Sequence, residues 1–256
     1  MAPLAQLTAE NLVKDFGGLR AVDVDAFALY EGEIRAVIGP NGAGKTTFVS
    51  LLCGRFPPTS GRIAFEGRDI TALPAHERVA LGIAYTFQIT SIFGNLTLYD
   101  NVALPAQRRV TLDGRGTVRG RALEALERVG LSDRAQEVAS AQSYGHQRLL
   151  EVAMGLALAP KVLILDEPTQ GLADGEIEAF VTLIREVAAE ATILLIEHNM
   201  PVVMDVADRI SVLESGRLLA EGTPAEIRAD EAVQAAYLGR DAPSPGASGA
   251  AAGAAS

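Results

Sequence analysis

The residues best suited to chemistry in this chain form a glycine-rich loop at positions 39–46, which reads GPNGAGKT. The loop fits the pattern G-x-x-x-x-G-K-[ST] without a gap, and in that pattern successive backbone N–H groups surround phosphate oxygens. Lys45 would then reach the β- and γ-phosphates, and the Thr46 hydroxyl would ligate Mg²⁺. The sequence therefore predicts a nucleoside triphosphate site, formed by Gly39, Asn41, Gly42, Gly44, Lys45, Thr46 and Thr47.

The segments on either side of this phosphate loop are those that it requires. Residues 34–38 (IRAVI) are typical of a short buried strand, and residues 46–53 (TTFVSLLC) predict the first turns of a helix. A helix that begins directly after the loop points its free N–H groups and the positive end of its dipole at a bound anion. A glycine-rich turn with a stray lysine would not need this context, so we favour the phosphate site.

A second motif supplies carboxylates. Residues 162–167 (VLILDE) form an apolar strand that ends in Asp166 and Glu167. In parallel α/β sheets the ligand lies beyond the carboxyl ends of the strands, so both acids are expected beside the γ-phosphate. Asp166 would hold Mg²⁺ through water, and Glu167 would act as general base on the attacking water. The alternative, a strand that merely ends in exposed acids, does not explain why this motif accompanies a phosphate loop.

Composition narrows the function classes. A chain of 256 residues can bury one substantial core, and its net charge of −10 argues against nucleic-acid binding, which needs a basic face. No apolar run is long enough for a membrane span, and the N-terminus lacks the features of a secretory signal. The one cysteine, Cys53, excludes an internal disulfide and is expected to be a buried packing residue. These features favour a cytosolic location.

The remaining pattern predicts an α/β protein. Apolar residues at 177, 180, 181, 184 and 187 recur at helical spacing between two apolar strands, which gives a βαβ unit and therefore a parallel sheet. Residues 241–256 are rich in Ala, Gly, Pro and Ser and are expected to be disordered. We predict strands at 6–13, 19–29, 34–38, 62–66, 82–87, 162–165 and 192–196, a hairpin at 210–220 and helical turns at 224–238. Helical structure is predicted at 98–158, interrupted at Gly114, Gly116, Gly120 and Gly130.

Taken in order, these motifs resemble the ATPase subunits of ABC transporters, and the resemblance covers residues 6–238. Four further positions match the family. Phe16 stands where an aromatic ring stacks on adenine, and Gln88 where a glutamine reaches Mg²⁺ and the water while its loop touches the permease. Residues 142–148 (QSYGHQR) stand at the family's signature segment, in which Ser143 and Gly145 would bind phosphate. His198 stands where a histidine holds the γ-phosphate.

The resemblance implies a P-loop NTPase with a RecA-like core, an antiparallel β subdomain and an inserted α-helical subdomain. It implies one ATPase domain over residues 1–240, with the helical subdomain at about 90–158. The signature segment of one subunit would face the ATP held by a second subunit, so the working unit is expected to be a homo- or heterodimer that binds ATP and Mg²⁺. Hydrolysis would let the two subunits separate and so drive membrane partners.

The chain departs from the family pattern at two places. The usual signature Leu-Ser-Gly-Gly-Gln has Gln142, Tyr144 and His146 in place of its Leu, first Gly and Gln. After Glu167-Pro168-Thr169 the family usually reads Ser-Ala-Leu-Asp, whereas this chain reads QGLA at 170–173. A carboxylate that normally crosses the dimer interface is therefore missing or shifted to Asp174, to which we assign no role.

Local strings narrow the resemblance to the branch of importers for branched-chain amino acids, urea and other amides. They are KDFGGLRAV at 14–22, LLIEHNM at 194–200, AEGTP at 220–224 and AYLG at 236–239. The branch implies two transmembrane permease subunits and an external solute-binding protein as partners, with the ATPase on the inner face of the membrane. The alternatives are a lipopolysaccharide export ATPase, a soluble ABC ATPase acting on DNA or ribosomes, and a regulator that has lost catalysis.

Overall fold

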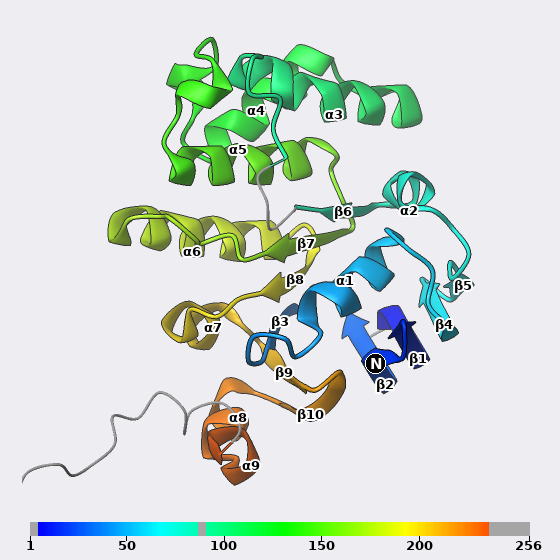
Figure 1. Ribbon diagram of the computed structural model, residues 1–256. Coiled ribbons are helices and arrows are strands. Elements are labelled where there is room, and N and C mark those ends of the chain that lie inside the picture. The colour runs from blue at the N-terminus through cyan, green and yellow to red at the C-terminus, as the bar shows by residue number, and fades with distance from the viewer. Residues whose placement is uncertain (1–4, 87–90, 236–256) are drawn as a thin grey trace, which may run out of the picture.

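The computed structural model describes residues 5–86 and 91–235 and is built on two β-sheets (Figure 1). The predicted fold class is confirmed, since one sheet is mainly parallel, the other is antiparallel, and a separate layer of helices covers one end of the molecule. The expectations for Gln88 and for the tail at 241–256 lie outside the described residues. None of the helices in the described ranges is long and apolar enough to cross a membrane.

The parallel sheet carries the two motifs with chemistry. Its strand order is β10-β9-β3-β8-β7-β6, in which only the β9–β10 hairpin is antiparallel. Crossover connections therefore bring the carboxyl ends of β3, β7 and β8 to the same edge of the sheet. The strands are β3 (Ile34–Ile38), β6 (Ile83–Tyr85), β7 (Val162–Asp166), β8 (Thr192–Ile196), β9 (Arg209–Glu214) and β10 (Arg217–Gly222).

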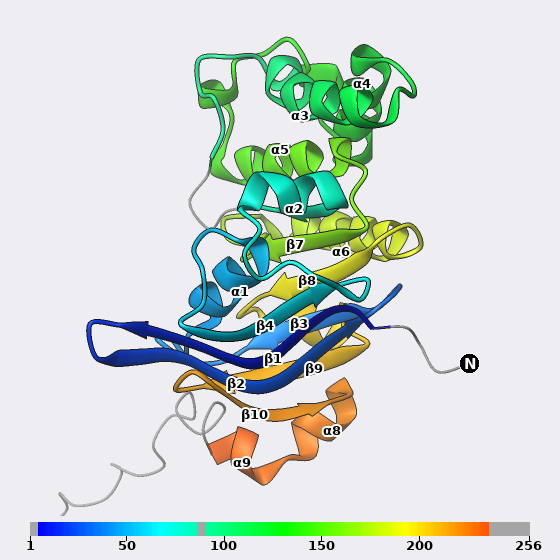
Figure 2. The same ribbon diagram turned by 90° about the vertical axis from the view of Figure 1, so that its right-hand side faces the viewer.

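The antiparallel sheet has the order β2-β1-β4-β5 and lies beside α1 (Lys45–Cys53) (Figure 2). Its strands are β1 (Ala5–Phe16), β2 (Leu19–Tyr30), β4 (Ser60–Phe65) and β5 (Arg68–Asp69), and β1 is longer than the strand predicted at 6–13. Phe27 of β2 and Phe48 of α1 meet edge to face, with ring centroids 5.1 Å apart. Cys53 is buried in this core, as predicted, and burial raises the pKa of its thiol.

Alternation along the strands of the parallel sheet divides the core between its two faces. Ile164 and Leu194 pack in the cluster that contains α1 and the antiparallel sheet. Their neighbours Leu163 and Leu195 pack in the cluster that contains the helices of the other face. This is the period of two that places successive strand residues on opposite faces, and here both faces are covered by apolar residues.

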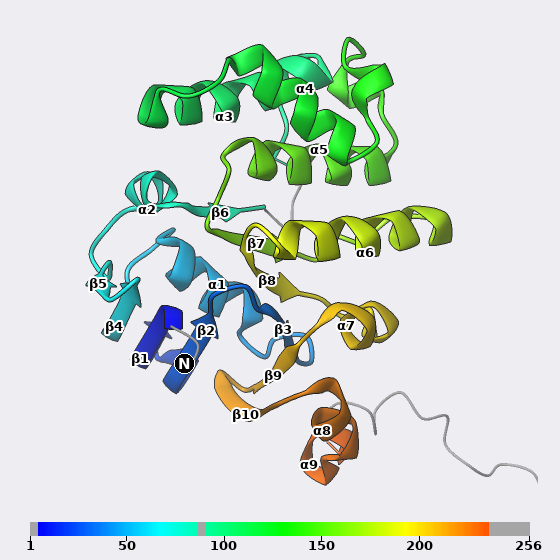
Figure 3. The same ribbon diagram turned by 180° about the vertical axis from the view of Figure 1, so that it is seen from behind.

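The helices of that other face are α6 (Asp174–Ala188) and α7 (Met200–Val206), which lie opposite α1 (Figure 3). The segment predicted to be helical at 98–158 is broken, because Gly114 ends one helix in the left-handed region and Thr117 caps the next. It forms α3 (Leu98–Asp113), α4 (Val118–Arg128) and α5 (Tyr144–Ala157), with 3₁₀ turns at Ser132–Arg134 and Ala139–Ala141 between α4 and α5. The remaining helices are α2 (Ala75–Leu81), α8 (Pro224–Ala229) and α9 (Glu231–Val233).

Arg78 of α2 donates hydrogen bonds to carbonyl groups at the C-terminus of α1, the helix that follows the phosphate loop. Its side chain is 1% exposed, and its guanidinium donates to the carbonyls of Leu51 (2.7 Å) and Leu52 (2.8 Å), near the C-terminus of α1. It also donates to the carbonyls of Leu73 and Thr71 at 2.9 and 3.0 Å. One side chain thus satisfies carbonyls that the end of a helix leaves without intrahelical partners.

Arg78→Met is therefore expected to lower the free energy of unfolding by about 3 kcal/mol, because it removes a buried guanidinium that donates to four carbonyls. Within the described residues, the Leu51 carbonyl would keep only its bond from the Gly54 N–H, at 3.1 Å. Urea denaturation of both proteins measures the difference. Arg62→Met is the matched control, since Arg62 makes an exposed ion pair with Asp69 and its removal should cost about 0.5 kcal/mol or less. Equal losses in the two variants would contradict the role given to Arg78.

Candidate functional site

The phosphate loop connects β3 to α1 and has the backbone that its glycines allow. Gly39 has φ +153°, and a Cβ there would lie 2.1 Å from the carbonyl oxygen of Leu213. Gly44 has φ +96°, and its Cβ would lie 2.4 Å from the carbonyl oxygen of Ala21. A side chain at either position would push the loop away from β9 or β2, so the glycines of the motif are needed for packing as well as for phosphate.

Lys45 lies within this loop and is largely buried. Its Nζ donates to the carbonyl oxygens of Gly39 at 2.7 Å and Pro40 at 3.1 Å, so the ammonium group lies inside the curve of the loop. Burial lowers the pKa of Lys45, while the nearby carboxylates of Glu167 and Asp166 act in the opposite direction. Burial removes the water that would solvate the ammonium group, and a bound phosphate would stabilise its positive charge instead.

A cavity of about 590 Å³ opens over the loop. Residues 41–47 line it together with Phe16 and Glu167. Sequence reasoning missed the rest of the wall, which comes from the start of β2 at Leu19–Ala21 and from the β9–β10 turn at Ser215 and Gly216. The turn is fixed to the loop because the Gly216 N–H donates to the Ala43 carbonyl at 2.9 Å.

Phe16 presents an accessible ring at the mouth of this cavity. The side chain is 47% exposed, and the ring packs edge to face on Phe56, with the two ring centroids 5.6 Å apart. Lys14 Nζ lies 5.0 Å from the centroid of the Phe16 ring and donates to the carbonyl of Pro57. A ring held in this way suits stacking on a nucleobase.

The two acids of the second motif arrive at the same sheet edge as the loop. In the strand register Asp166 lies opposite Ile196 of β8, and Val37 of β3 lies opposite the same residue from the other side. Glu167 has φ +49°, an unusual value for a residue with a side chain, and its N–H donates to the Ile196 carbonyl at 2.8 Å. Such strain persists where surrounding contacts fix it, and it is common at functional sites.

The residues present suit a divalent cation. Asp166 is buried, and among the described residues its Oδ1 has no hydrogen-bond partner, while Oδ2 accepts from the Tyr85 hydroxyl at 2.8 Å. Burial raises the pKa of Asp166, and this effect exceeds the opposing ones of the Tyr85 hydrogen bond and of the Arg148 and Lys45 cations, which marks a desolvated carboxyl group. In the described ranges no three His, Cys, Asp or Glu side chains are grouped to hold a metal. A cation held by Asp166, Thr46, water and phosphate oxygens therefore fits better than a cage built from protein alone.

His198 follows β8 and lies at the same edge. Its Nδ1 is 3.9 Å from Glu167 Oε1, and its side chain is 58% exposed. The structure thus brings together the loop, both acids and the histidine, which the sequence predicted from three separate segments. Gln88 lies outside the described residues, so its place relative to them is not described.

The signature segment occupies a different place. Ser143 caps α5, with its Oγ accepting from the His146 N–H at 3.2 Å, and Gly145 is buried in the first turn. Of the described residues that line the cavity over the phosphate loop, none belongs to this segment. The two predicted phosphate-binding groups are therefore separate within one chain, as a site shared between two subunits requires.

The two departures from the family pattern contact each other. The Tyr144 ring lies against Gly171, where an added Cβ would come within 2.3 Å of Tyr144 Cδ1, and the Tyr144 hydroxyl donates to Gln170 Oε1 at 3.2 Å. The larger residue in the signature segment is thus accommodated by the smallest residue in the loop that follows Glu167. The two segments form one packed unit within a subunit.

Gly171→Ala is expected to destabilise the fold by about 2 kcal/mol, because it combines φ +82° with the collision against Tyr144. Thermal or urea unfolding measures the change. Gly175→Ala is the matched control, since nothing lies within 4 Å of its added Cβ and it is helical, so that variant should be neutral or more stable. Tyr144→Gly in the Gly171→Ala background should recover part of the loss, and no recovery would contradict the packing argument.

Sequence analysis also missed a buried ion pair within α5. Arg148 Nη1 lies 2.9 Å from Glu151 Oε2, and both side chains are 5% exposed or less. Glu151 Oε1 accepts from the Ser91 N–H at 2.5 Å, and Arg148 lies over the Tyr144 ring at 5.3 Å. This chain of contacts joins residue 91 to the signature segment. Charged residues in the middle of an otherwise apolar helix were the sequence signal that could have revealed it.

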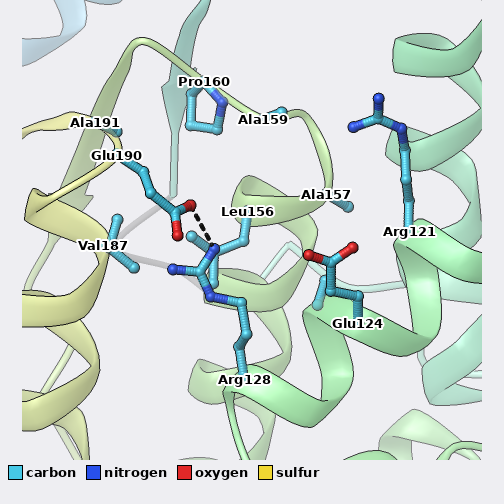
Figure 4. Close-up of a pocket in the computed structure, with 11 residues that line it drawn as sticks. Arg121, Glu124, Arg128, Leu156, Ala157, Ala159, Pro160, Val187, Glu190 and Ala191 are labelled. Carbon is cyan, nitrogen blue, oxygen red and sulfur yellow. Dashed lines mark hydrogen bonds and ion pairs between the residues drawn. The ribbon is translucent and has the colours of Figure 1, made fainter. Parts of the chain in front are cut away.

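A smaller hollow of about 180 Å³ lies on another part of the molecule, between α4, the end of α5 and the end of α6 (Figure 4). Arg128 and Glu190 face each other across it, with Arg128 Nη1 3.0 Å from Glu190 Oε2. It contains none of the predicted site residues. We therefore take the cavity over the phosphate loop as the functional site.

Comparison with known proteins agrees with this geometry. The family model described as ABC transporter matches residues 22–170, and that described as branched-chain amino acid ATP-binding cassette transporter matches residues 217–243. The chain is 39% identical over 252 residues to LivG of Salmonella typhimurium, a high-affinity branched-chain amino acid transport ATP-binding protein, covering 91% of this chain and 97% of the relative. BraF of Pseudomonas aeruginosa, which has the same description, is 37% identical over 248 residues, covering 91% of this chain and 97% of the relative.

An export protein is similar at a lower identity. LptB of Escherichia coli, the lipopolysaccharide export system ATP-binding protein, is 36% identical over 239 residues, covering 93% of this chain and 99% of the relative. Among solved structures, a nucleotide-free ATP-binding cassette from an ABC transporter superposes with a TM-score of 0.83 at 28% identity, covering 91% of this chain and 99% of that one. A cassette in its ADP conformation superposes with a TM-score of 0.82 at 28% identity, covering 92% and 99%. The chain belongs to the ABC transporter family of ATP-binding proteins.

Proposed function

We propose that this chain is the ATP-hydrolysing subunit of an ABC importer that takes up branched-chain amino acids or a related small polar solute. The observation that carries the proposal is the meeting of phosphate loop, paired acids and His198 at one sheet edge, in a chain whose C-terminal segment matches the branched-chain cassette model. The names of the relatives LivG and BraF support the same solute class.

The proposal assigns a task to each predicted site residue. Lys45 and the loop N–H groups bind the β- and γ-phosphates, and the ring of Phe16 supports the adenine. Glu167 takes a proton from the attacking water, while His198 and Gln88 orient the γ-phosphate and that water. Thr46, Asp166 and Gln88 would hold Mg²⁺, which when bound offsets the negative charge of the phosphates.

The assembly in this proposal is a dimer of ATPase subunits beneath two permease subunits. Ser143 and Gly145 at the start of α5 would complete the site of the partner subunit, because the N-terminus of a helix favours an anion. A solved cassette related to this chain is described as dimeric, at 25% identity. The proposed location is the cytoplasmic face of the membrane, and the external solute-binding protein would act through the permeases.

The test is capture of the Glu167→Gln chain from native membranes in the presence of ATP, followed by mass spectrometry of what accompanies it. Permease subunits of the importer type, with a solute-binding protein for branched-chain amino acids encoded or captured with them, are the expected result. Soluble or ribosomal proteins alone would overturn the transporter assignment.

Lipid export is the second candidate, favoured by the 36% identity to LptB. The same capture separates the two candidates, because an exporter would retain membrane partners of the lipopolysaccharide system. ATP-dependent uptake of labelled leucine into vesicles with the captured complex would then decide for import.

A further inference from the structure

Glu197 is a fully buried acid that neither the motifs nor the proposed function uses. It is 0% exposed and lies between Ile196, the last residue of β8, and His198. A buried carboxylate is costly unless it is hydrogen-bonded, so its partners indicate what the position is for.

The two oxygens of Glu197 serve two different loops. Oε1 accepts from the N–H of Thr169, at 3.1 Å, and from the Thr169 hydroxyl. Oε2 accepts from the N–H groups of His198, at 2.7 Å, and Asn199, at 2.9 Å. Thr169 lies two residues after Glu167, so one carboxylate connects the loop of the proposed general base to the loop of the proposed γ-phosphate histidine.

The hydrogen-bond donors to Glu197 within the described residues are backbone N–H groups and a hydroxyl, all neutral, and His198 Nδ1 lies 3.7 Å from Oε2. Backbone N–H groups that point at a carboxylate stabilise its charged form without adding a counter-charge to the site. A carboxylate suits this place because both of its oxygens accept hydrogen bonds. A glutamine has one accepting oxygen, and its NH₂ would meet the donors of one loop.

We propose that Glu197 is a positioning residue for ATP hydrolysis, which holds the Glu167 loop and the His198 loop at a fixed separation. The proposal rests on the proposed function, because it takes Glu167 and His198 as the groups that act on the γ-phosphate. The second connection between these loops is the bond from the Glu167 N–H to the Ile196 carbonyl, which fixes the backbone near Glu167 but leaves Thr169 and His198 untouched. The Glu197 side chain thus connects the two loops at Thr169 and His198, beyond the ends of β7 and β8.

The test compares ATP binding and turnover in Glu197→Gln and the wild-type chain. The phosphate loop makes none of the contacts of Glu197, so the Kd for ATP should stay within about twofold. Because small displacements of catalytic groups are costly, kcat should fall by at least about 30-fold with KM nearly unchanged. Glu197→Asp, which keeps two accepting oxygens on a shorter stem, should recover part of kcat.

Controls separate positioning from general damage. Glu178→Gln removes an exposed carboxylate on α6 and should leave kcat and Kd unchanged. Thr169→Val removes only the hydroxyl donor and should lower kcat by a smaller factor, which keeps the proposal testable if Glu197→Gln does not fold. In a His198→Ala background the added effect of Glu197→Gln on kcat should shrink, since part of its action is through that histidine.

Three outcomes would overturn the proposal. A wild-type kcat in Glu197→Gln would contradict the positioning role and leave the proposed function intact. If Glu197→Gln does not fold, a wild-type kcat in Thr169→Val would have the same meaning. Equal losses of ATP affinity and kcat together with a lower melting temperature would reduce Glu197 to a structural residue. A wild-type chain with no ATP turnover even with its membrane partners would overturn the proposed function, and with it this proposal.

Discussion

Glu167→Gln is expected to bind ATP as tightly as the wild-type chain and to hydrolyse it at least about a hundredfold more slowly. Glutamine has the shape of the glutamate, so the cavity that Glu167 lines keeps its form, but an amide cannot take a proton from water. The side chain is 15% exposed, lines the cavity, and has its Oε1 3.9 Å from His198 Nδ1. With the role proposed for His198, Glu167 would lie at the γ-phosphate end of a nucleotide on the loop. With hydrolysis blocked, ATP should hold two subunits together as a stable dimer.

Phosphate release measures turnover, a fluorescent ATP analogue measures affinity, and size-exclusion chromatography with ATP measures the dimer. Glu178→Gln is again the matched control, since it removes an exposed carboxylate outside the site. Phosphate release at the wild-type rate would exclude Glu167 as the general base. Loss of ATP affinity in this variant would instead mean that Glu167 contributes to binding.

The sequence predicted that the site forms at the carboxyl ends of the parallel strands, because each motif of the site is a short run of consecutive residues. The phosphate loop needs only a strand before it and a helix after it, and both were evident as short apolar segments at 34–38 and 46–53. The chain order of strand, helix and strand then required parallel β7 and β8. Loops that follow parallel strands meet at one edge, so Asp166 and Glu167 could be expected near Lys45 from the sequence, while His198 was expected there from the family resemblance.

The parts that sequence reasoning missed depend on contacts between distant segments. Ala21 and Gly216 complete the wall over the loop, but they become neighbours only when the antiparallel sheet packs beside the β9–β10 turn. Glu197 looks like any residue at a strand end until Thr169 is found beside it. No local pattern reveals such a pair, because 28 residues of chain separate the donor from the acceptor.

The helical region shows a different limit of sequence reasoning. The sequence predicts helical structure over 98–158 with interruptions at four glycines, and the structure has three helices with two 3₁₀ turns there. Gly114 does end a helix, whereas Gly120 lies inside α4. The breaks at Gly114 and Thr117 follow from capping chemistry, which the sequence contained. The turns between α4 and α5 instead depend on tertiary hydrogen bonds, such as that from the Ala139 N–H to the Leu96 carbonyl, which only the folded chain provides.

Lys45→Ala is expected to weaken ATP binding by about 100-fold, because it removes a charge-assisted contact to the phosphates worth about 3 kcal/mol. The fold should survive the change. In the absence of nucleotide the ammonium group is buried, and that burial lowers its pKa, so the cation is held at a cost that bound phosphate would offset. Its two hydrogen bonds to the carbonyls of Gly39 and Pro40 lie in a loop that opens onto the cavity, where water can replace the ammonium.

Isothermal titration with ATP gives the affinity, and thermal unfolding without nucleotide shows whether the loop is intact. Lys161→Ala is the matched control, because Lys161 makes an exposed ion pair with Glu66 and does not line the cavity, so ATP affinity should be unchanged. Adding ATP should raise the melting temperature of the wild-type and Lys161→Ala proteins but not that of Lys45→Ala. Wild-type ATP affinity in Lys45→Ala would exclude residues 39–46 as the phosphate site, since no arrangement of loop N–H groups alone replaces a buried cation.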